Sequence, residues 1–278
     1  MSSELSALYK NRPVILWVED ELTRIVLRAL WQDPDIGLLI AGGSQAVRST
    51  VNDARRAGHE NVFGIRDRDF GRSNQERWLR PESHVDVLIP DAFEIENHLL
   101  QFDALAGLGA AHNPRCRTAA ELQAKAQAVA EGSLWWMAVR ATIAASRVQL
   151  TDGFPAHPSL RNAPSLRTEA EALATLEERL LQSEWGLRVQ NWVPTLDRAW
   201  IVERMREQEA RLRADLESGS WRFNWSGKEV LAVVADDMGC GVADVARGLA
   251  GSAGGAGDFA ALRNLHAAIR KRSGLDDW

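Results

Sequence analysis

Cysteine and tyrosine are scarce in this chain of 278 residues, which contains two cysteines and one tyrosine. Two cysteines, Cys116 and Cys240, are too few for a disulfide framework or a cysteine-rich zinc site. No apolar run approaches the about 18 residues that a membrane-spanning helix needs, and we recognise no secretory signal sequence. The sequence therefore predicts a globular, cytoplasmic protein that has no membrane association.

A phosphate-binding loop is also missing. The glycine-rich stretch at residues 248–257 is not followed by Gly-Lys-Ser or Gly-Lys-Thr, so we expect no nucleotide-hydrolysing motor in this chain. Hydrophobic residues make up 45% and charged residues 26%, which is typical of a globular protein with one large or two modest domains. Tryptophan is abundant, with eleven copies, and we expect most of those in the C-terminal part to fill the core.

Short apolar runs alternate with helical patterns over the first hundred residues. The runs predict buried strands at residues 14–18, 37–41, 61–65 and 85–89. Apolar residues at helical spacing predict helices at residues 21–33, 45–57 and 91–100, the last with Asp91 as its N-cap. This alternation predicts the α/β class, with a mostly parallel four-stranded sheet flanked by helices.

The rest of the chain is predicted to be mainly helical. Thr118 with Glu121, and Thr168 with Glu171, form capping-box patterns that start helices. Two helices are predicted near the end, at residues 229–238 and 259–272, separated by the glycine-rich stretch. We expect a first domain at residues 1–105 and a helical region at residues 106–278 that packs on it or extends its core.

Acidic residues follow the predicted strands. Glu19 ends the first, and Asp67 and Asp69 follow the third. If these strands are parallel, their carboxyl ends meet at one sheet edge, where open α/β folds place their sites. Clustered like charges need a counter-ion, and carboxylate oxygens without cysteine or a histidine cluster suit Mg²⁺ or Mn²⁺ better than zinc. The alternative is that these are ordinary strand-end acids, since aspartate is common in turns.

Within such a site, Glu19 and Asp67 would be direct metal ligands and Asp69 a direct or water-mediated ligand. Glu19 could instead act as a general base. Glu94 and Glu96 follow the fourth predicted strand. They lie two residues apart on a predicted helix, so at most one of them is expected to face the site.

Five arginines follow the third predicted strand: Arg66, Arg68, Arg72, Arg77 and Arg80. The chain has a formal net charge of −5, so a local basic stretch beside an acidic metal site could hold phosphates, with Arg66, Arg68 and Arg72 as the candidates. A solvated loop is an equally simple explanation.

Lys228 precedes one of the last predicted helices. A solvated lysine is unfavourable at a helix start, because the helix dipole disfavours cations there. A lysine that reached the metal site could stabilise negative charge in a phosphoryl transition state or protonate a leaving oxygen.

These motifs resemble a known family. A glutamate after strand one (Trp17-Val18-Glu19-Asp20), the pair Gly42-Gly43 after strand two and Asp67-x-Asp69 after strand three resemble the Toprim domain of topoisomerases, primases and several nucleases. The segment at residues 93–97, Phe-Glu-Ile-Glu-Asn, resembles Toprim nucleases related to the overcoming-lysogenization-defect family. The resemblance is greatest to the effector subunits of PARIS-type phage-defence systems. It covers about the first hundred residues, and Gly227-Lys228-Glu229 extends it.

The resemblance implies a Toprim-like (Rossmann-like) fold for residues 1–105 and a divalent-metal-dependent nuclease acting on RNA, including transfer RNA, or on DNA. It favours Glu96 over Glu94 as a ligand and gives Lys228 a catalytic role with Glu19 and Asp67. It further implies a toxic effector of abortive infection, controlled by a separate ABC-type ATPase. The runner-up is a non-catalytic Toprim module that binds nucleic acid or scaffolds a complex. The sequence leaves open whether the chain forms a homodimer.

Overall fold

The computed structural model describes residues 3–10, 12–68, 70, 86–112, 117–147, 165–251 and 259–275. The chain divides into two compact units, the first formed by residues 1–69, 74–123 and 227–278 and the second by residues 70–73 and 124–226. The C-terminal residues thus return to the unit that begins the chain. The expected domain division at residue 105 stays a prediction.

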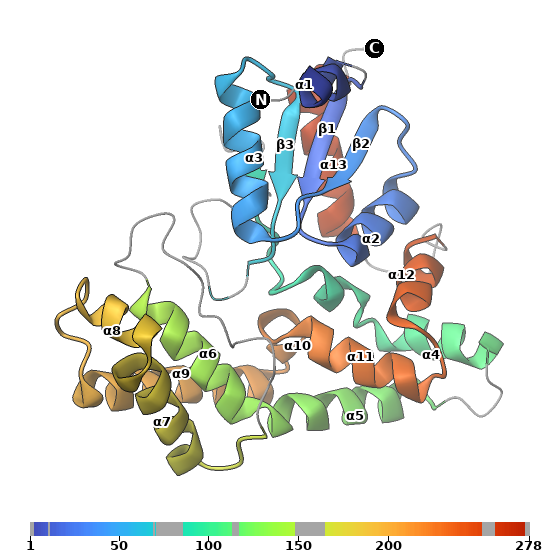
Figure 1. Cartoon of the computed structure of the whole chain (residues 1–278). Helices are drawn as coiled ribbons and strands as arrows, with labels where there is room; N and C mark the ends of the chain where they lie inside the picture. Colours follow the sequence, from blue (N-terminus) through green and yellow to red (C-terminus); the bar gives the residue numbers. More distant parts are fainter. Residues whose placement is uncertain are drawn as a thin grey trace. The chain divides into compact units, whose positions relative to one another are not determined.

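A four-stranded, all-parallel sheet forms the centre of the first unit (Figure 1). Its strands lie in the order β2-β1-β3-β4. They are β1 (Val14–Val18), β2 (Ile36–Ile40), β3 (Val62–Ile65) and β4 (Val87–Leu88). In the register of the sheet, Ile15 of β1 lies opposite Gly37 on one side and Val62 on the other. The predicted α/β class, with a parallel sheet, flanking helices and a helical C-terminal part, is confirmed.

The sheet is accompanied in the first unit by helices from both ends of the chain. They are α1 (Ser3–Lys10), α2 (Glu21–Trp31), α3 (Ser44–Arg56), the 3₁₀ helix η1 (Ile95–Leu99), α4 (Phe102–His112), the start of α5 (Ala119–Gly132), α11 (Gly227–Asp237), α12 (Val242–Gly251) and α13 (Ala260–Arg272). In the view of Figure 1, α3 lies beside β3 and α13 lies behind the strands.

The apolar core on one face of the sheet forms between β1, β3 and α3. Ile15 and Val62 pack there with Val47 and Val51 of α3. Gly64 in β3 allows this close approach, because a Cβ atom at that position would lie 2.5 Å from Cγ1 of Val47. The alternation of side chains along β1 directs Leu16 and Val18 to the opposite face, where they are also fully buried. Burial on both faces is what a continuous apolar strand predicts.

The prediction of a helix at residues 91–100 is wrong. Residues 91–94 form bends, and the helical part is the short η1. Glu94 rather than Asp91 is its N-cap, with extended backbone angles of φ −138° and ψ 165°. All residues from 92 to 100 are buried, so this segment runs through the core instead of lying on the surface as an amphipathic helix.

The glycine-rich stretch at residues 248–257, which we expected to separate two helices, is partly helical itself. Its first residues, Gly248–Gly251, end helix α12, which the sequence did not predict, and residues 252–258 lie outside the described residues. Gly248 is a packing position, because a Cβ atom there would lie 2.8 Å from Cδ1 of Leu108 in α4. Its lack of a side chain therefore lets two helices approach closely.

The regular secondary structure of the second unit is helical in its described residues. It contains most of α5 and the helices α6 (Leu134–Ser146), α7 (Glu169–Glu177), a π-helical turn η2 (Glu178–Gln182), α8 (Glu184–Gln190), α9 (Arg198–Ser218) and α10 (Trp221–Asn224). Trp136, Trp221 and Trp225 are buried, as expected for core tryptophans, whereas Trp192 is exposed. No helix in the described part of either unit has the length and apolar character needed to cross a bilayer.

Asp33 ties the end of α2 to α13. Its Oδ2 atom lies 2.7 Å from Nε2 of His266 and accepts a hydrogen bond of 2.6 Å from Arg270. Trp31 stacks on the His266 ring and donates from Nε1 to the carbonyl oxygen of Leu262. Burial alone would raise the pKa of Asp33, but the hydrogen bonds from His266 and Arg270 outweigh it and lower that pKa. The aspartate therefore binds α13 more strongly as the anion.

We expect Asp33→Asn to lower the free energy of unfolding by about 1–3 kcal/mol at pH 7, because a buried charge-assisted pair is replaced by a weaker neutral contact. A carboxylate with a lowered pKa stabilises the fold above its ordinary pKa of 3.8 and loses this effect as the pH falls through the folded-state value. The difference between variant and wild type in urea unfolding should therefore shrink toward pH 3. Asp53→Asn, on the exposed face of α3, should stay within about 0.5 kcal/mol of wild type at both pH values.

Candidate functional site

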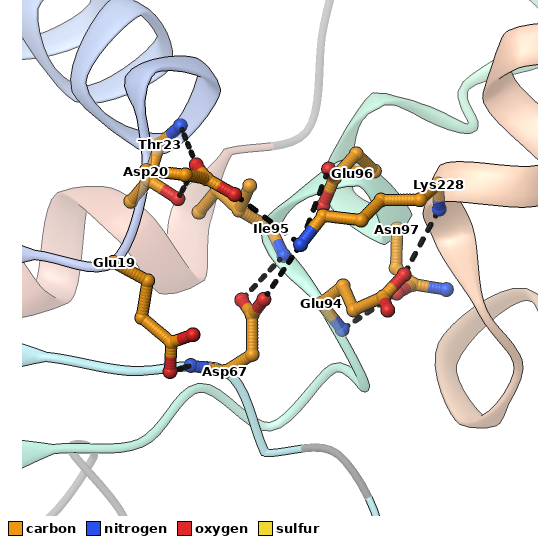
Figure 2. Close-up of polar contacts among 9 residues, drawn as sticks. All are labelled: Glu19, Asp20, Thr23, Asp67, Glu94, Ile95, Glu96, Asn97 and Lys228. Carbon is orange, nitrogen blue, oxygen red and sulfur yellow. Dashed lines mark hydrogen bonds and ion pairs between the residues drawn. The ribbon is translucent and has the colours of Figure 1, made fainter. Parts of the chain in front are cut away.

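Two predicted site residues, Glu19 and Asp67, meet at the carboxyl edge of the sheet. Glu19 directly follows β1 and Asp67 lies two residues beyond β3, and these strands are neighbours. Oε1 of Glu19 accepts a hydrogen bond of 3.0 Å from the backbone N–H of Asp67 (Figure 2). Asp67 is only 6% exposed, and its Oδ1 atom accepts from the backbone N–H of Ile95 at 3.3 Å. Asp67 therefore links β3 to the start of η1.

Glu94 holds the N-terminus of α11. Its Oε2 atom accepts a hydrogen bond of 2.9 Å from the backbone N–H of Lys228, the second residue of that helix. Its own backbone N–H donates to Oδ1 of Asn97 at 2.8 Å. A carboxylate at a helix N-terminus satisfies an otherwise unpaired N–H and is stabilised by the helix dipole. The visible role of Glu94 is therefore to position α11.

Glu96 differs from Glu94 in having an oxygen atom that its surroundings leave unsatisfied. The residue is 1% exposed, and Oε2 has no hydrogen-bond partner among the described residues. Burial raises the pKa of Glu96 well above its ordinary value, with Lys228 opposing this shift and Asp67 and Glu94 adding to it. An unsatisfied buried carboxylate oxygen is unfavourable and calls for a proton or a cation.

The ammonium group of Lys228 lies among these carboxylates. Its Nζ atom is 3.2 Å from Oδ2 of Asp67 and 3.9 Å from Oε1 of Glu96. Burial would lower the pKa of Lys228, but Glu96, Asp67, Glu94 and Asp20 outweigh burial and raise it. The carboxylates thus hold a cation at a helix start that would otherwise disfavour it.

Asp20 is a site residue that the sequence analysis did not identify. It is the N-cap of α2, and its Oδ1 atom accepts hydrogen bonds from the backbone N–H and the hydroxyl of Thr23, both at 2.9 Å. Its Oδ2 atom lies 3.2 Å from Nζ of Lys228. The hydrogen bonds from Thr23 and the charge of Lys228 lower the pKa of Asp20 against the effect of burial. In the sequence, an aspartate directly before a helical pattern predicts a helix N-cap and gives no sign of a role in a functional site.

The other predicted residues are only partly described. Asp69 and Arg72 lie outside the described residues, as do Arg77 and Arg80. Arg66 and Arg68 are partly exposed, and Nη1 of Arg66 donates to Oγ of Ser44 at 3.3 Å. Ser44 is the first residue of α3, so this contact places Arg66 near the start of that helix.

Carboxylates from separate segments gather at this edge of the sheet. Figure 2 draws those of Glu19, Asp20, Asp67, Glu94 and Glu96 together with the ammonium group of Lys228. Within the described ranges, no three His, Cys, Asp or Glu side chains converge closely enough to hold a metal ion as they stand. The ammonium of Lys228 lies between the carboxylates that would have to converge. The site therefore has hard oxygen donors and a protein cation among them.

Comparison of the chain with protein-family models, with curated proteins and with solved structures finds no match.

Gly227 sets how closely α11 approaches η1. A Cβ atom on Gly227 would lie 2.8 Å from both the backbone nitrogen and Oδ1 of Asn97. Neither atom can move without disturbing the Glu94–Asn97 capping box. The glycine therefore places Lys228, the next residue, within reach of the carboxylates.

We expect Gly227→Ala to lower the melting temperature and to weaken the contact between Lys228 and Asp67, because the added methyl group pushes α11 away from η1. The matched control is Gly107→Ala in α4, where a Cβ atom meets nothing within 4 Å. This control should be neutral or stabilising, by about 0.5–1 kcal/mol, since alanine favours a helix over glycine. Thermal unfolding followed by circular dichroism gives the melting temperature of each variant. Equal melting temperatures for Gly227→Ala and Gly107→Ala would contradict the tight packing at Gly227.

Proposed function

We propose that this chain is a divalent-metal-dependent nuclease that hydrolyses phosphodiester bonds in RNA or DNA, with a Toprim-like fold in its sheet-containing unit. The observation that carries the proposal is that, at the carboxyl edge of a parallel sheet, Glu19 contacts the backbone of Asp67 while Asp67 and Glu96, from separate segments, share the ammonium of Lys228. Glu96 adds a buried oxygen atom that lacks a partner among the described residues. Ligands in open α/β folds bind at this edge.

The residues present fit Mg²⁺ or Mn²⁺. Carboxylate oxygens are hard donors that suit these ions, and several carboxylates lie close to one another here. The unsatisfied Oε2 atom of Glu96 is the specific feature that a cation would satisfy. Glu19, Asp67 and Glu96 would hold the metal, and Asp69 stays a candidate ligand by its place in the sequence.

A divalent cation bound here would supply positive charge to a phosphate oxygen and lower the pKa of a nearby water molecule. Glu19 is fixed by its hydrogen bond to the Asp67 backbone, so it could hold the metal or accept a proton from the attacking water. Lys228 carries a positive charge into the same region and could stabilise the charge that develops on the phosphate. Its raised pKa makes it a weak proton donor, so this electrostatic role is the one we propose in place of protonation of the leaving oxygen. Arg66, Arg68 and Arg72 are proposed to bind the nucleic-acid backbone.

The biological role we propose is that of a toxic effector in anti-phage defence, controlled by a separate ABC-type ATPase. This part of the proposal rests on the resemblance of the first hundred residues to the effectors of PARIS-type systems. A non-catalytic module that binds nucleic acid is the alternative, and one observation favours it: Lys228 already neutralises part of the acidic cluster. Nuclease assays and metal binding separate the two functions.

Metal binding should be visible as stabilisation. Because a ligand that binds only the folded state stabilises it by mass action, Mn²⁺ at 100 times its dissociation constant should add about 2.7 kcal/mol to the free energy of unfolding. We expect Glu96→Gln to abolish this response. Glu94→Gln should keep most of it, since the side chain of Glu94 holds the backbone of α11. Thermal melts with and without millimolar Mn²⁺ test this, and an undiminished response in Glu96→Gln would exclude Glu96 as a ligand.

Cleavage is tested by incubating the purified chain with Mg²⁺ or Mn²⁺ and separate pools of transfer RNA, plasmid DNA and single-stranded DNA, with and without the candidate ATPase. Asp67→Asn and Glu19→Gln should abolish cleavage. Asparagine is preferable to alanine at position 67, because Asp67 is buried and accepts a hydrogen bond from Ile95. At saturating metal, Lys228→Ala should lower the rate by a factor on the order of 10²–10³, as for the loss of one preorganised electrostatic group.

Asp53→Asn is the charge-matched control, since Asp53 is exposed on α3, and it should cleave like wild type. Cleavage that survives both Asp67→Asn and Glu19→Gln would reject the proposed active site. Metal binding without cleavage of any substrate pool, with and without the ATPase, would favour the non-catalytic alternative.

A further inference from the structure

The main chain and the side chain of Lys228 are held in different ways. Its backbone N–H is fixed by Oε2 of Glu94 at 2.9 Å, and the preceding Gly227 packs tightly on Asn97. Its side chain is 45% exposed, and Nζ is held by ion pairs with Asp20, Asp67 and Glu96, of which the one to Asp67 is also a hydrogen bond of 3.2 Å. A lysine side chain has four rotatable bonds. The ammonium group can therefore move while α11 stays in place.

Two different carboxylate groups share this ammonium. Asp67 and Glu96 are the buried ones, 6% and 1% exposed. Asp20 is more exposed, at 35%, and its Oδ2 atom is as close to Nζ as that of Asp67, at 3.2 Å. Asp20 is fixed independently through Oδ1 by its bonds to Thr23. Asp20 can therefore keep the ammonium without help from Asp67 or Glu96.

The ammonium group of Lys228 does not satisfy the two buried carboxylates, Asp67 and Glu96. Nζ is 3.9 Å from Oε1 of Glu96, which is longer than a hydrogen bond, and Oε2 of Glu96 has no partner among the described residues. A divalent cation has twice the charge and can bind several carboxylate oxygens at short distances. Asp67 and Glu96 would gain from exchanging the ammonium for such an ion.

We propose that Lys228 is a tethered competitor of the divalent cation, whose ammonium holds Asp67 and Glu96 when no metal is bound and transfers to Asp20 when metal binds. This inference rests on the metal site of the proposed function. Two positive charges cannot share Asp67 and Glu96 at close range without strong repulsion, so the lysine lowers the apparent affinity for metal. By linkage, any group that draws the ammonium away, such as a substrate phosphate, raises that affinity.

The test is the dissociation constant of Mn²⁺, measured by isothermal titration calorimetry on the full chain. We expect Lys228→Met to bind Mn²⁺ about tenfold or more tightly than wild type, because the competing charge is gone. Lys228→Arg, which keeps the charge, should stay close to wild type. The control for overall charge is Lys271→Met, on the exposed end of α13, which should leave the dissociation constant unchanged.

Stability gives a second readout of the same exchange. In EDTA, Lys228→Met leaves Asp67 and Glu96 without their counter-charge, so its melting temperature should fall below that of wild type. The rise on adding Mn²⁺ should then be larger for Lys228→Met than for wild type. A variant that folds only when Mn²⁺ is present gives the extreme form of this expected result.

A double-mutant cycle with Asp20→Asn tests the second position of the ammonium. Asparagine keeps the helix cap but removes the charge, so metal affinity should fall about threefold or more while Lys228 is present. In the Lys228→Met background the same change should have little effect. Glu21→Gln, beside Asp20 but exposed and paired with Arg24, is the control for charge at a distance and should change neither background.

The outcomes separate this inference from the proposed function. If wild type binds Mn²⁺ and Lys228→Met binds it equally or more weakly, the exchange is rejected while the metal site stands. If Asp20→Asn has the same effect in both backgrounds, or none with Lys228 present, the transfer to Asp20 is rejected. If neither wild type nor Lys228→Met binds Mn²⁺ and neither is stabilised by it, the metal site itself is rejected, and the exchange with it.

Discussion

The ion pairs of Lys228 with carboxylates from three separate segments are the interaction on which the candidate site depends. Asp67 and Glu96 are nearly inaccessible to solvent, and buried carboxylates without a counter-charge strongly destabilise a fold. The lysine supplies that charge from α11, which lies far away in the sequence. It thereby joins the C-terminal helices of the first unit to the carboxyl edge of the sheet.

The positions of the carboxylates around Lys228 follow from the order of the strands and from the start of α11. β1 and β3 are neighbours in a parallel sheet, so the residues that follow them, Glu19 and Asp67, lie side by side. The carboxylate of Glu94 caps the N-terminus of α11, whereas that of Glu96 pairs with the ammonium of Lys228, so two glutamates only two residues apart have different partners. Glu19, Asp67 and Glu94 each hold a backbone N–H, and Asp67 also pairs with Lys228.

The sequence predicted the sheet better than the segments that cross the core. Each strand is a short apolar run, and such runs specify buried strands by local pattern alone. The prediction for residues 91–100 was wrong because this segment is held by groups distant in the sequence. Asp67 accepts a hydrogen bond from the backbone N–H of Ile95, and Glu94 accepts one from the backbone N–H of Lys228. Helix α12 was missed because Gly248 disfavours a helix locally, whereas packing on Leu108 requires a small residue there.

The sequence by itself determined the α/β class, the parallel strands and the gathering of Glu19 and Asp67 at one edge, because these follow from the period of apolar residues and the direction of the strands. The sequence also offered Lys228 as a residue that could reach the acids, where its ammonium group lies. Only the tertiary structure decided that Glu94 and Glu96 have different contacts with Lys228 and that Asp20 belongs to the site. Those relations join residues more than 100 positions apart. They depend on side-chain reach and burial, which no local pattern encodes.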